Sequence, residues 1–178
     1  MIINNVKLVL EDDVVQGSLE IEGGVIRAFA ESPSSLPEAL DGEGGWLLPG
    51  LIELHTDNLD KFFTPRPKVD WPAHSAMSSH DALMVASGIT TVLDAVAIGD
   101  VRDGGDRLEN LEKMINAVEE TQKRGVNRAE HRLHLRCELP HHTTLPLFEK
   151  LVGREPVTLV SLMDHSPGQR QFANREKY

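Results

Sequence analysis

The sequence predicts an α/β fold, the front half of a (β/α)₈ barrel preceded by a small N-terminal β subdomain. Residues 1–30 alternate apolar and polar side chains with the two-residue period of strands. After Pro49-Gly50, short apolar runs alternate with helical patterns, which is typical of βαβ units around a parallel sheet. We therefore expect a β subdomain and connector at residues 1–48 and the first four β/α units of a barrel at residues 49–178.

The N-terminal subdomain is predicted to be antiparallel. Its apolar residues stand in three runs: Val6, Leu8 and Leu10, then Leu19 and Ile21, then Val25 and Ile26. Gly23-Gly24 separates the last two runs, as in a tight hairpin turn. Residues 31–45 contain Pro, Gly and Ser and have no period, so we expect an irregular connector there.

Four strands are expected in the second part, at residues 51–57, 89–98, 132–139 and 157–164. Ser79 can cap a helix through Ser87, with Gly88 at its C′ position. A second helix begins at Asp106 and ends at Gly125, and a third runs from Thr144 to Gly153. The apolar stripe of the second helix is Leu108, Leu111, Ile115 and Val118. A complete barrel has eight strands in roughly 250 residues, so four β/α steps make a front half.

Composition excludes several classes of protein. The 18 Lys and Arg against 28 Asp and Glu give a net charge of −10, so we expect neither nucleic acid nor an anionic membrane as a partner. The single cysteine, Cys137, excludes a disulfide framework and favours a cytoplasmic location. We find no signal peptide and no apolar run of about 18 residues, and we expect a soluble globular protein.

The first predicted barrel strand ends in a His and an Asp. His55 and Asp57 are two residues apart, so both side chains leave the same face of the strand. They lie at the carboxyl end, where barrel enzymes place their chemistry, and both are ligand types for divalent metals. The alternative is a pair that only hydrogen-bonds at the strand end.

The third predicted strand has one polar and one apolar face. The polar face holds His134, Arg136 and Glu138, and the apolar face holds Leu133, Leu135, Cys137 and Leu139. A polar face inside a barrel is costly unless its groups bind something or pair with one another. Glu138 is the next candidate metal ligand, and the alternative is an ion pair of Arg136 with Glu138 or Glu53. We expect Cys137 to be a buried, unreactive thiol.

Basic residues near the strand ends predict a place for an anion. The segment 59–78 reads as an unusually long loop that includes Lys61 and Arg66. His141 follows the third strand, and His165 and Arg170 follow the fourth. These five residues are the candidate phosphate ligands. The alternatives are a solvated, proline-stiffened loop and an ordinary turn between strand and helix.

The segment PGLIELHTD after a β lead-in resembles the first-strand signature PGxIDxHxH of the amidohydrolase superfamily of metal-dependent barrel hydrolases. Three segments more narrowly resemble the diphosphatases of the carbon-phosphorus lyase pathway: ELHTDNLDKFFTPRPKVDWP, LHLRCELPHH and DHSPGQRQF. The resemblance implies a phosphorylated sugar phosphonate substrate, hydrolysed from the 5-triphosphate to the 5-phosphate with release of diphosphate.

The resemblance also implies one or two divalent ions, zinc or manganese, held by His55, Asp57 and Glu138. The phosphate groups would then be neutralised by Lys61, Arg66, His141, His165 and Arg170. Asp57 replaces the second His of the signature, and Glu138 is expected to substitute for the superfamily's bridging group, because the fourth predicted strand has no lysine.

Under the same resemblance the catalytic base and the later ligands lie beyond residue 178, so we expect this fragment alone to be inactive. Two alternative functions stay open: an amidohydrolase that cleaves a C–N bond, such as a cyclic amidase or deacetylase, and a non-catalytic barrel scaffold. A homo-oligomer also stays open.

Overall fold

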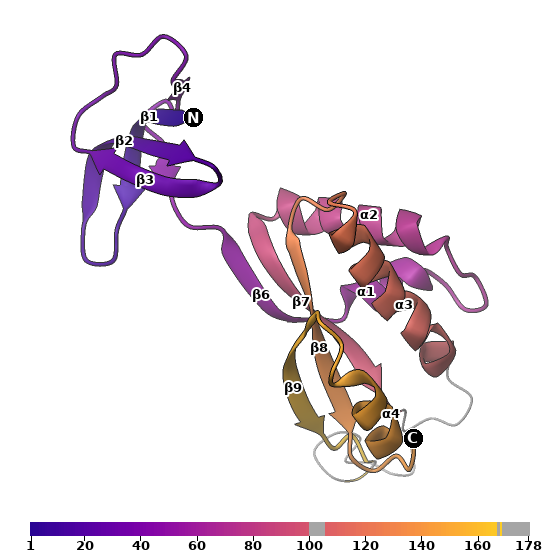
Figure 1. The fold of residues 1–178 in the computed structure, drawn as a ribbon. Helices are drawn as coiled ribbons and strands as arrows, with labels where there is room; N and C mark the ends of the chain where they lie inside the picture. The colour runs from indigo at the N-terminus through magenta and orange to yellow at the C-terminus, as the bar shows by residue number, and fades with distance from the viewer. Residues whose placement is uncertain (100–105, 167, 169–178) are drawn as a thin grey trace. The chain divides into compact units, whose positions relative to one another are not determined.

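The computed structural model describes residues 1–99, 106–166 and 168, with the backbone alone for residues 106–109. The chain divides into two compact units, Met1–Pro49 and Gly50–Tyr178 (Figure 1).

The first unit is a small sheet. Strands β1 (Ile2–Val9), β2 (Val14–Glu22) and β3 (Val25–Ala30) pair antiparallel in chain order, as predicted. Gly23 and Gly24 make the hairpin turn with φ of 59° and 76°. The expected connector is not wholly irregular, because β4 (Leu40–Asp41) and β5 (Trp46–Leu47) each pair in parallel with β1. Strands of two residues are too short to show a period in the sequence.

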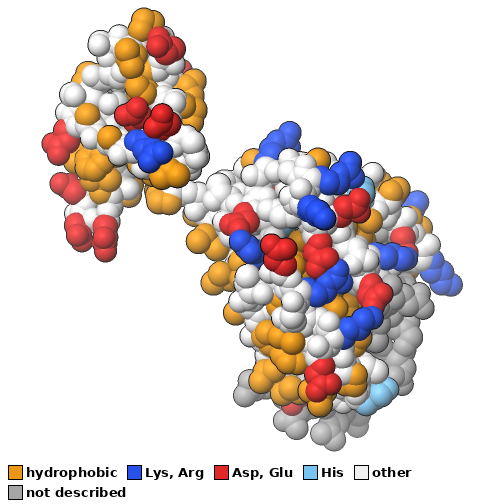
Figure 2. Space-filling view, in the orientation of Figure 1, with side chains coloured by type: hydrophobic (Ala, Val, Ile, Leu, Met, Phe, Trp, Pro, Cys, Tyr) orange, Lys and Arg blue, Asp and Glu red, His pale blue; other side chains and the backbone are white. Residues whose placement is uncertain are grey.

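The core of the first unit is correspondingly small. Val6 and Leu8 are buried, whereas Val25, Ile26 and Phe29 of β3 are each about half exposed or more. Hydrophobic side chains are accordingly visible on the surface of this unit in Figure 2.

The second unit is built on a parallel sheet with the order β6-β7-β8-β9. The strands are β6 (Leu51–Thr56), β7 (Ile89–Ile98), β8 (Glu130–Glu138) and β9 (Val157–Met163). Their positions agree with the prediction to within two residues at each end. Figure 1 shows the helices of this unit lying along one side of the sheet.

The helices of the second unit are α1 (Asn58–Phe63), α2 (Ala73–Ala86), α3 (Asp106–Lys123) and α4 (Thr144–Leu151). The prediction of a long loop at residues 59–78 is wrong, since α1 and the first part of α2 lie in it. Leu59 and Phe63 are one helical turn apart and both buried, so packing stabilises α1 despite the nearby prolines. None of the described helices is long and apolar enough to cross a membrane.

The predicted start of α2 at Ser79 is also wrong. The helix begins six residues earlier, directly after Pro72, whose ring fixes a φ that suits a helix entry. Its predicted end is confirmed, because Gly88 follows the helix with a φ of 79°.

The core of the second unit lies between the sheet and the helices. Leu111, Ile115 and Val118 of α3 are buried in it, which confirms three members of the predicted stripe; the side chain of Leu108 lies outside the described residues. The apolar face of β8 is also confirmed for Leu133, Leu135 and Cys137, and burial raises the pKa of the Cys137 thiol. Leu139 differs: it follows the end of β8 and is exposed.

Leu135→Ala is expected to lower the free energy of unfolding of the chain by about 2–5 kcal/mol, because Leu135 is fully buried and its truncation leaves a cavity. Leu145→Ala is the matched control, since Leu145 lies on the surface and its loss should cost less than about 0.5 kcal/mol. Urea denaturation measures both. Equal losses in the two variants would contradict the assignment of the core.

Candidate active site

The polar face of β8 points away from the helices. His134, Arg136 and Glu138 alternate along the strand with the leucines and the cysteine that pack against the helices. Asp57 directly follows β6, and His165 follows β9 by two residues. Because these strands are parallel, their carboxyl ends lie at the same edge of the sheet, where barrel enzymes place their chemistry.

Arg136 links two of the predicted metal ligands. Its Nη1 lies 2.5 Å from Oδ1 of Asp57, and its Nε lies 3.8 Å from Oε1 of Glu138. The ion pair of Arg136 with Glu138 that the sequence offered as an alternative is therefore present, and Asp57 rather than Glu53 is the second partner. Oε1 of Glu53 instead accepts a hydrogen bond from the backbone N–H of His55.

His165 is the candidate phosphate ligand that reaches this cluster. Its Nδ1 donates a hydrogen bond of 2.7 Å to Oε1 of Glu138. The structure thus brings Asp57, Glu138 and His165 together around Arg136, with residues contributed by the ends of β6, β8 and β9.

His55 lies at the edge of the same cluster, beside a histidine that the sequence did not assign to the site. Its Nε2 is 3.8 Å from Oδ1 of Asp57, and its ring meets the ring of His134 edge to face with centroids 4.7 Å apart. His134 donates from Nδ1 to the carbonyl of Leu54, and its Nε2 accepts from the hydroxyl of Ser161. Burial lowers the pKa of His134, so the ring is neutral and its orientation is fixed by these two bonds.

Two buried polar atoms of the cluster, Nε of Arg136 and Oε2 of Glu138, have no hydrogen-bond partner among the described residues. The Glu138 side chain is only 5% exposed, and a buried carboxylate oxygen without a donor is costly unless it binds a cation or a ligand. One imidazole and two carboxylates form a donor set that zinc and manganese both accept. The residues present therefore fit a divalent ion, although Arg136 now occupies the position between the two carboxylates.

Of the other candidate phosphate ligands that the structure describes, none has a side chain that forms a hydrogen bond or ion pair with the cluster. Lys61 and Arg66 are exposed, and their side chains form no ion pair or hydrogen bond with the rest of the described chain. Nδ1 of His141 accepts a hydrogen bond from the hydroxyl of Thr143, and its ring stacks on that of His142. Arg170 lies outside the described residues.

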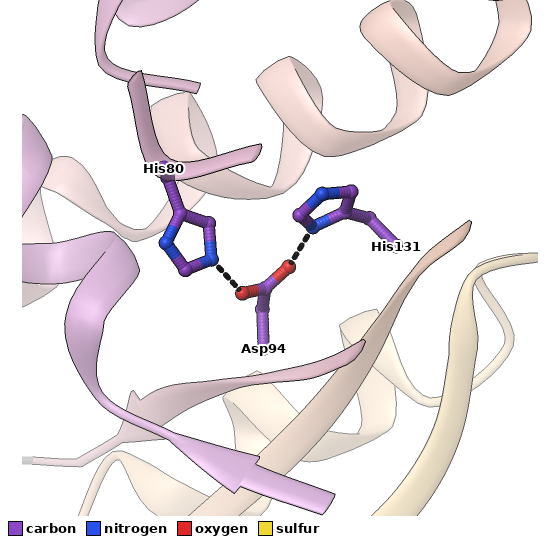
Figure 3. A group of neighbouring side chains, drawn as sticks. All are labelled: His80, Asp94 and His131. Atoms are coloured by element: carbon purple, nitrogen blue, oxygen red, sulfur yellow. Dashed lines mark hydrogen bonds and ion pairs between the residues drawn. The ribbon is translucent and has the colours of Figure 1, made fainter. Parts of the chain in front are cut away.

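A second polar cluster, which the sequence analysis missed, lies on the helix side of the sheet. It consists of His80, Asp94 and His131, all fully buried (Figure 3). In these three side chains the possible metal-binding atoms all lie within 4.8 Å of one another. Among residues 1–99, 106–166 and 168, the predicted ligands His55, Asp57 and Glu138 do not form such a group. Asp94 was the available signal, because an acidic residue inside the apolar run 89–98 needs a buried partner.

The four-stranded parallel sheet with helices along one side is the fold of half a (β/α)₈ barrel. Solved structures have the same fold. A triazine hydrolase of Arthrobacter aurescens has a TM-score of 0.55 and 15% identity, and it matches 90% of this chain and 45% of its own. The atrazine chlorohydrolase of the same species, solved with zinc, has a TM-score of 0.51 and 16% sequence identity. The match covers 92% of this chain and 46% of the chlorohydrolase chain. A D-hydantoinase has a TM-score of 0.51 and 19% sequence identity, and the match covers 89% of this chain and 32% of the hydantoinase chain. The predicted fold class is confirmed.

A particular enzyme is far more similar in sequence. Over all 178 residues the chain is 93% identical to the alpha-D-ribose 1-methylphosphonate 5-triphosphate diphosphatase of Escherichia coli (strain K12). The chain spans 47% of that protein, about half its length. The resemblance found in the sequence motifs is thus confirmed. No family model matches the chain.

Proposed function

We propose that a full-length protein containing this chain is a metal-dependent hydrolase of phosphonate catabolism. It converts alpha-D-ribose 1-methylphosphonate 5-triphosphate to the 5-phosphate and diphosphate. The observation that supports this proposal is the 93% identity to the diphosphatase, which extends over the whole chain. The cluster at the strand ends supports it independently, because its acidic and imidazole groups suit a divalent cation and its basic groups suit phosphate.

In this proposal His55, Asp57 and Glu138 hold one or two ions of zinc or manganese. The ion would supply an activated water for attack at phosphorus. His165 orients Glu138 through its hydrogen bond to Oε1, which leaves Oε2 available as a ligand atom. His134 fixes the carbonyl of Leu54 beside the His55 ring, so that β6 and β8 keep their side chains in one arrangement.

The cations of the chain receive the phosphate groups. Lys61 lies on α1, which begins directly after Asp57, and Arg66 lies on the loop that follows α1. Because both side chains are free of ion pairs with described residues, they can bind an anion without first breaking a protein contact. His141, His165 and Arg170 follow the carboxyl ends of β8 and β9 and complete the proposed phosphate ligands.

Arg66→Ala and Lys61→Ala are expected to raise KM for the triphosphate substrate by about 10-fold each, since each removes one charge-assisted hydrogen bond worth roughly 1.5 kcal/mol. Metal content should stay unchanged, because neither side chain can bind a cation. Lys123→Ala, at the exposed end of α3, is the control of equal charge. Steady-state kinetics on the full-length protein measure these changes. An unchanged kcat/KM in both Arg66→Ala and Lys61→Ala would contradict the proposal that these residues bind the substrate.

The proposed function is tested with a full-length protein that carries this sequence. It is loaded with Zn²⁺ or Mn²⁺ and offered the sugar phosphonate triphosphate or a cyclic amide. Release of diphosphate from the triphosphate alone is the expected result. Hydrolysis of the amide without diphosphate release would support the C–N hydrolase instead, and a protein without bound metal and without turnover would support a scaffold.

A further inference from the structure

We propose that His80, Asp94 and His131 form a second divalent-metal site, structural in role and separate from the strand-end cluster. Its three residues come from three elements: α2, β7 and β8. His131 is the second residue of β8, whereas Glu138 is the last. The site therefore lies toward the opposite end of the strand and on the helix side, away from the proposed active site.

The donor atoms converge on one carboxylate. Nε2 of His80 lies 2.5 Å from Oδ1 of Asp94, and Nδ1 of His131 lies 2.7 Å from Oδ2. Each ring thus faces a different oxygen of the same carboxylate, as Figure 3 shows. Two imidazole nitrogens and two carboxylate oxygens make four donors, which is the number that a closed structural zinc site uses.

A further carboxylate orients one of the two rings. Nε2 of His131 lies 3.3 Å from Oδ1 of Asp81, and that oxygen also accepts the backbone N–H groups of Arg128 and Ala129. A histidine that binds a metal through one nitrogen commonly donates its other N–H to a carboxylate, and this outer contact fixes the ring orientation. Asp81 provides that contact for His131.

The charges of the cluster also favour a cation. Asp81 and Asp94 are both buried, and in the described part of the chain their ion pairs are with histidines and not with lysine or arginine. With neutral imidazoles, two buried negative charges would be uncompensated, and a divalent ion balances them.

The test uses the full-length protein with the strand-end cluster disabled by Asp57→Ala and Glu138→Gln. Refolded with Co²⁺ or Zn²⁺ and dialysed, this protein should retain about one equivalent of metal, because a buried site is filled during folding. Cobalt should give the visible absorption of a tetrahedral site. A protein that retains no metal after this treatment would overturn the proposal, whatever the wild-type enzyme hydrolyses.

Variants of the helix-side cluster give a second readout. In the same background, Asp94→Asn or His131→Gln should lose the metal and the cobalt absorption, whereas Asp81→Asn should keep the site with roughly 10- to 100-fold lower affinity. His142→Ala, an exposed histidine, is the control. Metal that persists in folded Asp94→Asn and His131→Gln proteins would show that it binds elsewhere. If these variants do not fold, the cobalt absorption spectrum of the Asp57→Ala, Glu138→Gln protein, in which His80, Asp94 and His131 are intact, tests the proposal.

Discussion

Asp57→Ala in the full-length protein is expected to lose the strand-end metal and the diphosphatase activity together, with kcat/KM falling by more than about 100-fold. The physical reason is that Asp57 offers one of two carboxylates at the ends of β6 and β8, and water cannot replace its negative charge. His55→Ala should show the same paired loss, since its ring lies beside Asp57. Elemental analysis and phosphate release, measured on the same samples, test this prediction.

Asp57 is also an ion-pair partner of Arg136, so loss of activity alone would not separate a ligand from a structural residue. Metal content makes the distinction. Asp57→Asn keeps the shape and a hydrogen-bond acceptor but removes the charge, and it should lose metal as Asp57→Ala does. A variant of Asp57 or of His55 that keeps both its metal and its turnover would rule out the replaced residue as a metal ligand.

The strands could be predicted from the sequence because each is a short apolar run, and two of them are preceded or followed by a residue that ends a regular element. Gly88 ends α2 immediately before β7, and Pro140 follows β8. Helix α1 was missed because its six residues lie just before Pro65 and Pro67, and the burial of Leu59 and Phe63 stabilises it. Packing against other helices, rather than local preference, decided that segment.

The candidate metal ligands at the strand ends could be proposed from their spacing in the sequence, but their contacts with other side chains could not. Arg136 reaches Asp57 across β7, since β6 and β8 are not neighbours in the sheet. His134 likewise reaches the carbonyl of Leu54. Such contacts depend on the curvature and register of the sheet, which no local pattern specifies.

The helix-side cluster shows the same limit. Asp94 alone indicated a buried partner, yet His80 precedes it by 14 residues and His131 follows it by 37. In the sequence His80 lies within a predicted helix and His131 just before a predicted strand, so neither suggested chemistry. Only the packing of α2 across β7 and β8 brings the two rings to one carboxylate.

Arg136→Met is expected to lower the free energy of unfolding of the metal-free full-length protein by about 3–5 kcal/mol. Methionine keeps much of the buried aliphatic volume but removes the charge that now faces Asp57 and Glu138. Glu138 is almost fully buried, so most of the loss should come from that carboxylate, while Asp57 is screened by water. Denaturation in a chelating buffer measures the loss. Arg132→Met, whose ion pair with Glu130 is exposed, is the control and should change stability by less than about 0.5 kcal/mol.

Two additions to this experiment connect Arg136 with metal binding. If Asp57 and Glu138 are metal ligands, saturating Mn²⁺ should stabilise Arg136→Met more than the wild type, because the ion no longer competes with a guanidinium for the carboxylates. The double variant Arg136→Met with Glu138→Gln should recover much of the lost stability without metal, since no uncompensated buried charge remains. It should also lose the extra response to Mn²⁺. An equal response to Mn²⁺ in the wild type and in Arg136→Met would mean that Arg136 and the ion do not share these carboxylates, and the strand-end ligand set would then have to exclude both Asp57 and Glu138.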